Sequence, residues 1–267
     1  MNKIAWATDI HLDRLKERDY LEYKEYLSEL NPDCLIISGD IAEGEKVCES
    51  LKDFDESFNF PIYFVLGNHD FYWNSFEGVE NQVDQVVKAS QNLHWLTKSG
   101  VIKINDSSCL IGVEGWGDGQ NGTVNLSEGF TRDLRAIEDY KNLNRDEIVK
   151  FINKKGEHYA SLLHPNLLEA VNNYQNVLLV THVPPFVDDC FDRSLRICGE
   201  FKLPFYTCKA IGDLLLDVME NYPTCIMTVF SGHTHENADV KILDNLRVRV
   251  KESGYGNWWD ATIIKLD

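Results

Sequence analysis

Short apolar runs that end in clusters of aspartate, histidine, asparagine and glycine constrain this chain more than any other feature. Five clusters follow such runs in chain order: Asp9-Ile10-His11, Gly39-Asp40, Gly67-Asn68-His69-Asp70, Thr181-His182 and Gly232-His233-Thr234-His235. In open α/β sheets, ligands bind at the carboxyl ends of the strands, where loops on a rigid sheet direct distant side chains to one point. The pattern therefore predicts an α/β fold with a ligand site at its strand ends.

Strand-like and helix-like segments alternate along the chain, which is typical of an α/β domain. The expected strands are 3–8, 33–38, 61–66, 109–114, 177–181 and 225–230, with a run of strands from 239 to 266. The expected helices are 17–30, 44–56, 76–90, 144–173 and 207–221. No internal repeat or linker divides the sequence, so a single domain is expected over residues 1–267.

The composition is that of a globular protein, with 43% hydrophobic and 26% charged residues. No apolar run approaches the roughly 20 residues that cross a bilayer, so a membrane is not expected as a partner. The first apolar stretch, 4–7, is too short for a signal-peptide core. These observations predict a cytoplasmic protein.

The seven cysteines are scattered, odd in number and without a CxxC pair. Reduced thiols that pack as small hydrophobic side chains are the favoured interpretation. Cys190, Cys198 and Cys208 fall within one segment, and a redox or soft-metal site there is the alternative.

The net charge of −17 argues against long nucleic acid as a partner. Proteins that hold such polyanions usually show a basic stripe, and none is visible in the sequence. If cations bind among the clustered carboxylates, they offset part of this negative charge.

The residue types in the five clusters are metal donors. Aspartate and histidine supply the oxygen and nitrogen ligands suited to zinc, manganese or iron. Residues two apart in an extended chain point to the same side, so Asp9 and His11 are expected to bind one ion, and His233 and His235 share that spacing. Taken singly, each cluster is weak evidence, because Gly-Asp is also turn chemistry. Their common order after strand-like runs carries the prediction.

This order of motifs resembles the signature of the calcineurin-like metallophosphoesterase superfamily and runs from residue 9 to residue 235. The resemblance implies a four-layer α/β/β/α sandwich, with two mixed sheets face to face and helices outside. It also implies two metal ions, divalent or trivalent, with manganese, iron or zinc expected. The implied ligands are Asp9, His11 and His235 for the first ion, Asp40 as a bridge, and Asn68, His182 and His233 for the second.

Two further residues acquire roles from the resemblance. His69 matches the family histidine that acts on the leaving-group oxygen, and an expelled alkoxide does need a proton or a positive charge. Glu43 stands where the protein-phosphatase branch has an acid that orients this histidine. A solvated charge at a helix N-terminus is the equal alternative for Glu43.

The implied reaction is in-line attack by a metal-bridging hydroxide on the phosphorus of a small phosphate ester. Protein phosphatases carry Gly-Asp-x-Val-Asp-Arg-Gly, whereas this chain has Gly44 in place of the arginine. The pattern is similar to that of small bacterial-type phosphodiesterases, including the class III cyclic-nucleotide group, so a phosphodiester is favoured. The alternatives are a phosphomonoesterase or protein phosphatase of the superfamily, and a non-catalytic scaffold that retains the fold.

Two insertions, 116–140 and 184–206, are expected to lie on the substrate side of the site. The first looks like a mobile loop. The second contains basic residues suited to binding a phosphate, but solvation at the surface is the favoured interpretation for each of them: Arg193, Arg196 and Lys202. Tyr72 and Trp73 are expected either to stack on a substrate or to belong to the core.

Overall fold

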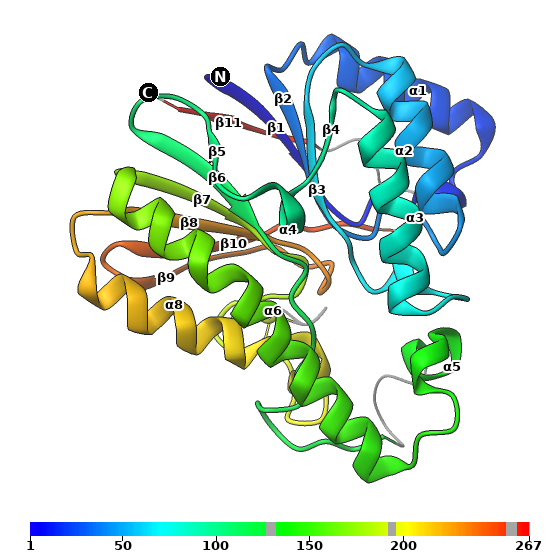
Figure 1. Cartoon of the computed structure of the whole chain (residues 1–267), viewed down its shortest axis with the longest axis vertical. Coiled ribbons are helices and arrows are strands. Elements are labelled where there is room, and N and C mark those ends of the chain that lie inside the picture. The colour runs from blue at the N-terminus through cyan, green and yellow to red at the C-terminus, as the bar shows by residue number, and fades with distance from the viewer. Residues whose placement is uncertain (127–131, 192–195, 255–260, 267) are drawn as a thin grey trace.

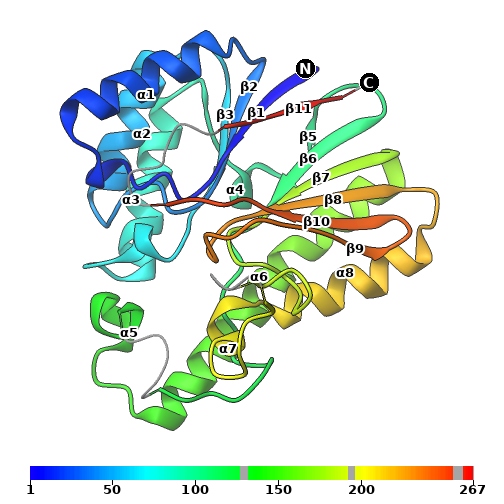
Figure 2. The ribbon, with the colours of Figure 1, turned by 180° about the vertical axis from the view of Figure 1, so that it is seen from behind.

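The fold contains two mixed β-sheets, as expected. The computed structural model describes residues 1–126, 132–191, 196–254 and 261–266. The first sheet has the strand order β11-β1-β2-β3-β4, and the second has the order β5-β6-β7-β8-β10-β9. Helices cover the outer face of each sheet (Figures 1 and 2). The predicted four-layer sandwich is thereby confirmed.

The first sheet is built around three parallel strands that each lead into a motif cluster. Its members are β1 (Lys3–Ala7), β2 (Cys34–Ser38), β3 (Ile62–Val65), β4 (Leu93–Trp95) and β11 (Thr262–Lys265). Strands β1 to β4 are parallel, and β11 runs antiparallel along β1. The motif loops after β1, β2 and β3 therefore leave the same edge of this sheet.

The second sheet brings the two later motifs to the site. Its members are β5 (Ile102–Lys103), β6 (Ser108–Gly112), β7 (Asn176–Val180), β8 (Ile226–Ser231), β9 (Ala238–Leu243) and β10 (Leu246–Val250). Strands β6, β7, β8 and β10 are parallel, while β5 and β9 are antiparallel edge strands. The clusters after β7 and β8 consequently lie beside each other.

Alternation along each strand separates two apolar cores. In β1, Ile4 and Trp6 face the other sheet, whereas Ala5 and Ala7 belong to the larger core under the helices. The Trp6 ring meets Phe230 of β8 edge to face at 4.9 Å between centroids, which joins the two sheets directly. This period of two is what face-to-face sheet packing requires.

Long helices lie where the sequence predicts them. They are α1 (Glu17–Glu29), α2 (Lys46–Ser57), α3 (Phe76–Ala89), α6 (Arg145–Asn173) and α8 (Lys209–Asn221). Helix α6 begins with a capping box. The Asn144 side chain accepts from two backbone N–H groups, and the Glu147 carboxylate accepts from the Asn144 backbone N–H. Helices α1 to α3 cover the first sheet, and α6 and α8 cover the second (Figure 1).

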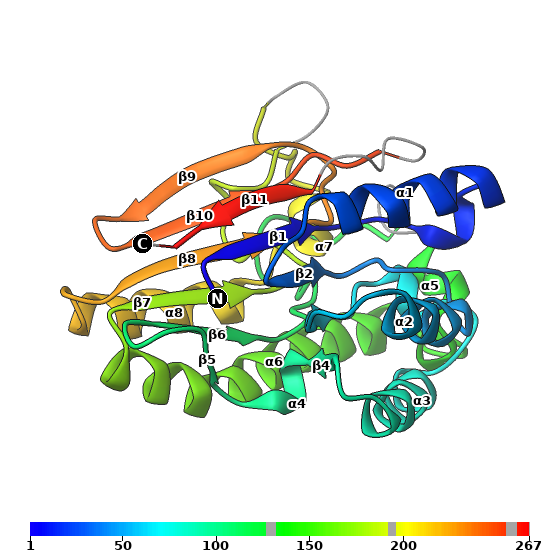
Figure 3. The ribbon, with the colours of Figure 1, turned by 90° about the horizontal axis from the view of Figure 1, so that it is seen from above.

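The short elements escaped sequence reasoning. They are β4, β5, α4 (Leu96–Ser99), α5 (Asp133–Ala136), α7 (Leu203–Tyr206) and the 3-10 turns Leu12–Arg14, His69–Phe71 and Glu138–Tyr140. Each spans too few residues to show a hydrophobic period. Two of them matter for function, because α5 and α7 belong to the predicted insertions and lie at the strand-end side of the molecule (Figure 3).

The two insertions pack against each other. Gly119 N donates to the Pro204 carbonyl at 2.8 Å, and Thr123 N donates to the Glu200 carbonyl at 3.0 Å. In the first insertion Trp116 is buried and donates from Nε1 to the Tyr140 hydroxyl at 3.0 Å. The described start of that insertion, expected to be a mobile loop, is thus part of the packed structure.

All seven cysteines are free thiols, and every one except Cys48 is buried. Four of them pack in the apolar cores as small hydrophobic side chains, which agrees with the favoured interpretation: Cys34, Cys109, Cys208 and Cys225. Within the described residues, no helix combines the length and apolar character that would cross a bilayer.

Candidate dinuclear metal centre

The motif loops are joined at the strand ends by backbone hydrogen bonds. Asp9 N donates to the Gly39 carbonyl at 3.0 Å, and His11 N donates to the Asp40 carbonyl at 3.1 Å. The buried Asp70 carboxylate ties in the third loop, because it accepts from the backbone N–H groups of residues 41, 42 and 67. Burial raises the pKa of Asp70 to about 7. The sequence motif contains Asp70 but predicts no role for it. In the structure its carboxylate joins the second and third motif loops.

One group of donors combines the first, second and fifth motifs. Donor atoms of four side chains all lie within 4.8 Å of one another: Asp9, His11, Asp40 and His235. His235 Nε2 lies 3.2 Å from Asp9 Oδ1, and His11 Nε2 lies 3.7 Å from Asp40 Oδ2. Carboxylates and imidazoles at such spacing suit a transition-metal ion.

A second group of donors lies on the other side of Asp40. Asn68 Oδ1 is 3.1 Å from His182 Nε2 and 3.0 Å from His233 Nδ1. His182 Nε2 is in turn 3.5 Å from Asp40 Oδ1. One oxygen of Asp40 thus faces each group, which is the position of a bridging ligand.

Backbone carbonyls determine which nitrogen of two histidines carries the proton. His182 Nδ1 lies 2.9 Å from the Ser38 carbonyl, and His233 Nε2 lies 3.1 Å from the Phe205 carbonyl. Because a carbonyl can only accept, these nitrogens donate, and the other nitrogen of each neutral ring keeps its lone pair.

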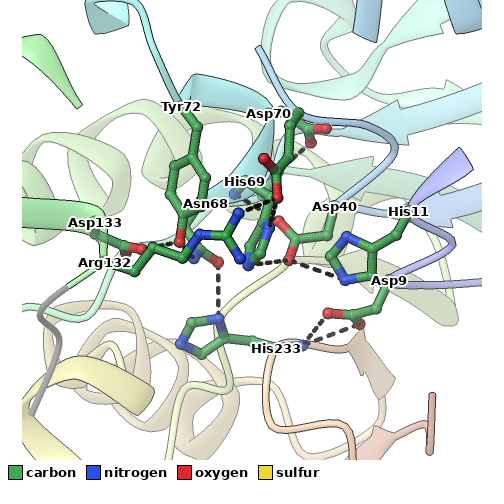
Figure 4. Close-up of polar contacts among 12 residues, drawn as sticks. Asp9, His11, Asp40, Asn68, His69, Asp70, Tyr72, Arg132, Asp133 and His233 are labelled. Carbon is green, nitrogen blue, oxygen red and sulfur yellow. Dashed lines mark hydrogen bonds and ion pairs between the residues drawn. The ribbon is translucent and has the colours of Figure 1, made fainter. Parts of the chain in front are cut away.

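These lone pairs meet the Asn68 amide oxygen. Asn68 Nδ2 donates to the Tyr72 hydroxyl at 3.1 Å and to Asp133 Oδ1 at 3.0 Å. Oδ1 is therefore the atom that faces His182 and His233, and Figure 4 shows its contact with His233. Three electron-rich atoms at these separations repel one another unless a cation lies among them. The residues present therefore fit a second metal ion.

Burial keeps the histidines in the form that binds metals. It lowers the pKa of His182, lowers that of His233 to about 3 and lowers that of His11 to about 2. The pKa of Asp40 is raised well above its usual value by burial and by the negative charges of Asp9 and Asp70. A cation between the two donor groups would reverse this effect on Asp40.

Five of the seven predicted ligands have left-handed backbone, which is uncommon outside glycine and clusters at functional sites. Their φ angles are 48° for Asp9, 40° for His11, 53° for Asp40, 68° for His233 and 61° for His235. The extended-chain argument for the two Asp/His-x-His pairs is therefore wrong. Asp9 and His11 do enter one donor group, but His233 and His235 enter different groups.

Glycines allow the loops to approach so closely. A Cβ on Gly67 would overlap Asp40 Oδ1, and one on Gly232 would overlap the Asp9 carboxylate. Both positions lie directly before a predicted ligand, Asn68 and His233 respectively.

His69 lies next to the donors and contacts Glu43. Its Nδ1 is 3.2 Å from Glu43 Oε1, while its Nε2 is 3.9 Å from Asp40 Oδ2. The same Glu43 oxygen pairs with Arg132 Nη2 at 2.6 Å and with Arg14. Burial, Arg132 and Arg14 lower the pKa of His69 to about 2. Glu43 is thus held by two cations instead of being a solvated helix charge.

Sequence reasoning missed Arg132 and Asp133, which come from the first insertion. Asp133 is 3% exposed and accepts from both Asn68 and the Tyr72 hydroxyl. The Arg132 guanidinium lies over the Tyr72 ring, 5.1 Å from its centroid. No motif marks this pair, and the only signal was the predicted position of residues 116–140 near the site.

The other basic and aromatic residues considered in the sequence analysis differ in exposure. Arg196 and Lys202 are exposed, and Arg193 falls outside the described residues. Tyr72 is buried, whereas the Trp73 side chain is 65% exposed. Of the aromatic pair, only Tyr72 takes part in the polar network at Asn68.

Solved structures with a similar fold include a hydrolase, a phosphatase and an anchor protein. Phosphopantetheinyl hydrolase from Mycobacterium tuberculosis is similar with a TM-score of 0.64 and 17% identity, covering 96% of this chain and 91% of that one. A dimetal phosphatase from Danio rerio is similar with a TM-score of 0.58 and 11% identity, covering 96% and 88%. GAP50, the anchor in the inner membrane complex of Plasmodium, has a TM-score of 0.51 and 14% identity, covering 94% and 71%.

Sequence comparison identifies the family. No curated protein sequence matches the chain significantly. The family model described as calcineurin-like phosphoesterase, however, matches residues 2–237. Because that match spans most of the 267 residues, the chain belongs to the calcineurin-like phosphoesterases and is a metal-dependent hydrolase of phosphate esters.

Proposed function

We propose that the enzyme hydrolyses a small phosphodiester at a centre of two metal ions. The first ion would be held by Asp9, His11 and His235, and the second by Asn68, His182 and His233, with Asp40 between them. The observation that carries the proposal is the convergence of two histidine lone pairs on Asn68 Oδ1. Bound ions would lower the pKa of water and neutralise charge on the phosphoryl oxygens.

His69 is proposed to assist the leaving group. Since a carboxylate oxygen accepts, the contact with Glu43 assigns the His69 proton to Nδ1 and leaves Nε2 directed to the site. Burial and two arginines oppose a second proton on this ring. A phosphate ester would bring negative charge that favours protonation of Nε2, and this proton would pass to the departing oxygen.

Glu43 is proposed to orient His69 and to hold Arg14 and Arg132 around it. The same Glu43 oxygen pairs with both guanidinium groups, so two positive charges lie beside His69. Positive charge beside the leaving group suits an anionic substrate.

The same arginines favour a second candidate, a phosphomonoesterase. Gly44 replaces the arginine of the protein-phosphatase motif, but Arg132 reaches the site from the first insertion. A monoester carries more negative charge than a diester at neutral pH, and an arginine beside His69 would stabilise it by charge-assisted hydrogen bonds.

Hydrolysis of two chromogenic esters tests the proposal. Metal-free protein reloaded with manganese would be assayed with bis-p-nitrophenyl phosphate and p-nitrophenyl phosphate. We expect manganese-dependent cleavage of the diester, lost in Asn68→Ala and His69→Ala but retained in the control Asn173→Ala, an exposed residue of α6. Preference for the monoester would select the second candidate. No turnover with any divalent metal would contradict both and leave the scaffold that retains the fold.

The cytoplasmic location stays a prediction, as does the expectation that neither long nucleic acid nor a membrane is a partner. The free state of all seven cysteines supports a reducing compartment. The choice among manganese, iron and zinc is also left to experiment, because this ligand set suits all three.

A further inference from the structure

The second donor group depends on the orientation of one amide. An asparagine side chain can present either its oxygen or its nitrogen to a neighbour, and only the oxygen is a metal ligand. With Nδ2 turned towards His182 and His233, the site would lose an oxygen donor. Something in the structure must therefore select the orientation in which Asn68 Oδ1 faces these histidines.

Asp133 and Tyr72 make that selection. Both lie on the side of Asn68 away from His233 (Figure 4). The Tyr72 hydroxyl donates to Asp133 Oδ1, so the hydroxyl oxygen remains free to accept from Asn68 Nδ2, as Asp133 Oδ1 also does. A flipped amide would lose both bonds and set Asn68 Oδ1 against the Asp133 carboxylate, where two acceptors repel.

Asp133 is held rigidly enough for this role. Its segment is joined to residues 73–76 by three bonds: Trp73 N to the Ala136 carbonyl at 2.7 Å, Glu138 N to the Asn74 carbonyl at 3.0 Å, and Phe76 N to Asp139 Oδ2 at 2.8 Å. Asp133 is also buried, so water competes little for its Oδ1.

We propose that Asp133 is a positioning residue which, with Tyr72, fixes the Asn68 amide so that the first insertion controls binding of the second metal ion. The inference rests on the proposed dinuclear centre. Removal of a residue that hydrogen-bonds to a metal ligand typically lowers metal affinity 10–100-fold. The effect should fall on the second ion, because Asp133 Oδ1 accepts from Asn68, a ligand proposed for that ion.

Manganese binding to metal-free protein, followed by calorimetry and by electron paramagnetic resonance, tests the proposal. We expect Asp133→Ala to bind the first ion with wild-type affinity and the second roughly 10–100-fold more weakly. The spin-coupled signal of a manganese pair should give way to that of a single ion. Asp133→Asn keeps an acceptor for Asn68 and should recover most of the affinity, while Tyr72→Phe should weaken the second ion less than Asp133→Ala does.

Asp139→Ala is the matched control. It removes an anchor of the same segment without touching Asn68, so it should leave the second ion bound as in the wild type. Equal weakening in Asp139→Ala and Asp133→Ala would overturn the positioning role in favour of general loosening. Unchanged binding in Asp133→Ala and in Tyr72→Phe would also overturn it. A wild-type chain that binds fewer than two ions would instead contradict the proposed function itself.

Discussion

At the scale of single residues, the side chains that could bind metal belong to sequence motifs, whereas the groups that fix their tautomers and orientation do not. Side chains of Asn68, His182 and His233 meet as their order in the sequence predicts. The Ser38 and Phe205 carbonyls that set the histidine tautomers carry no sequence signal, because every residue has a carbonyl. The tautomers of His182 and His233 and the orientation of the Asn68 amide therefore could not be predicted from the sequence.

Replacement of His69 tests its role in leaving-group departure. We expect His69→Ala to lower kcat roughly 10²–10⁴-fold, the usual contribution of a general acid. The loss should be greatest for esters with poor leaving groups, because those need the proton most. Rates for a series of aryl esters of differing leaving-group pKa would measure this dependence. The exposed His164→Ala serves as control, and an equal loss across the series would argue against proton donation.

Replacement of Arg132 tests the origin of substrate affinity. We expect Arg132→Ala to raise KM for a phosphomonoester about tenfold or more, because a charge-assisted hydrogen bond is worth about 1.5–3 kcal/mol. Arg135→Ala, at an exposed residue of the short helix α5 that follows Arg132, should leave KM unchanged. Steady-state kinetics on both variants decides the point, and an unchanged KM in Arg132→Ala would remove the arginine from substrate binding.

At the scale of elements, long periodic segments could be predicted and short ones could not. Helices α1, α2, α3, α6 and α8 begin and end within a few residues of the predicted positions. In contrast α5 and α7 have four residues each, too few for a period, and their positions depend on packing between the insertions. Helix α5 contains Asp133, which contacts Asn68, and α7 contains Phe205, whose carbonyl contacts His233, so both short helices supply residues that contact the donors.

The close approach of the loops at the strand ends predicts that a larger side chain at Gly67 lowers the stability of the fold. Gly67→Ala would push a methyl group into Asp40, so it should lower the free energy of unfolding by about 1–3 kcal/mol, the usual cost of overpacking. Urea unfolding of the metal-free protein measures this cost. Gly199→Ala, where a Cβ meets no atom within 4 Å, is the control. Equal stability of the two variants would show that the loops have room to move apart.

At the scale of the whole molecule, the negative charge of the chain and its metal centre are connected. Carboxylates buried without a cation destabilise the folded state, and the raised pKa of Asp40 expresses that cost. The net charge of −17 is thus partly a property of the metal-free chain. One domain over residues 1–267, expected from the sequence, stays a prediction.

Metal binding should therefore stabilise the fold. At a concentration 100 times its Kd, one ion adds about 2.7 kcal/mol to the free energy of unfolding, a rise in Tm of roughly 5–10 °C for a chain of this size. Differential scanning calorimetry with and without a chelator would detect it. A much smaller shift is expected in Asp40→Ala, which lacks the carboxylate proposed to bridge the ions, and an equal shift there would place the ions elsewhere.

The most direct test of the dinuclear centre is a titration of metal-free protein with manganese, in which bound metal and diester hydrolysis are measured together. The two donor groups that share Asp40 predict that two ions bind per chain and that hydrolysis rises with the second. Full activity with one equivalent, or two bound ions without any hydrolysis of phosphate esters, would contradict a catalytic centre of two metals.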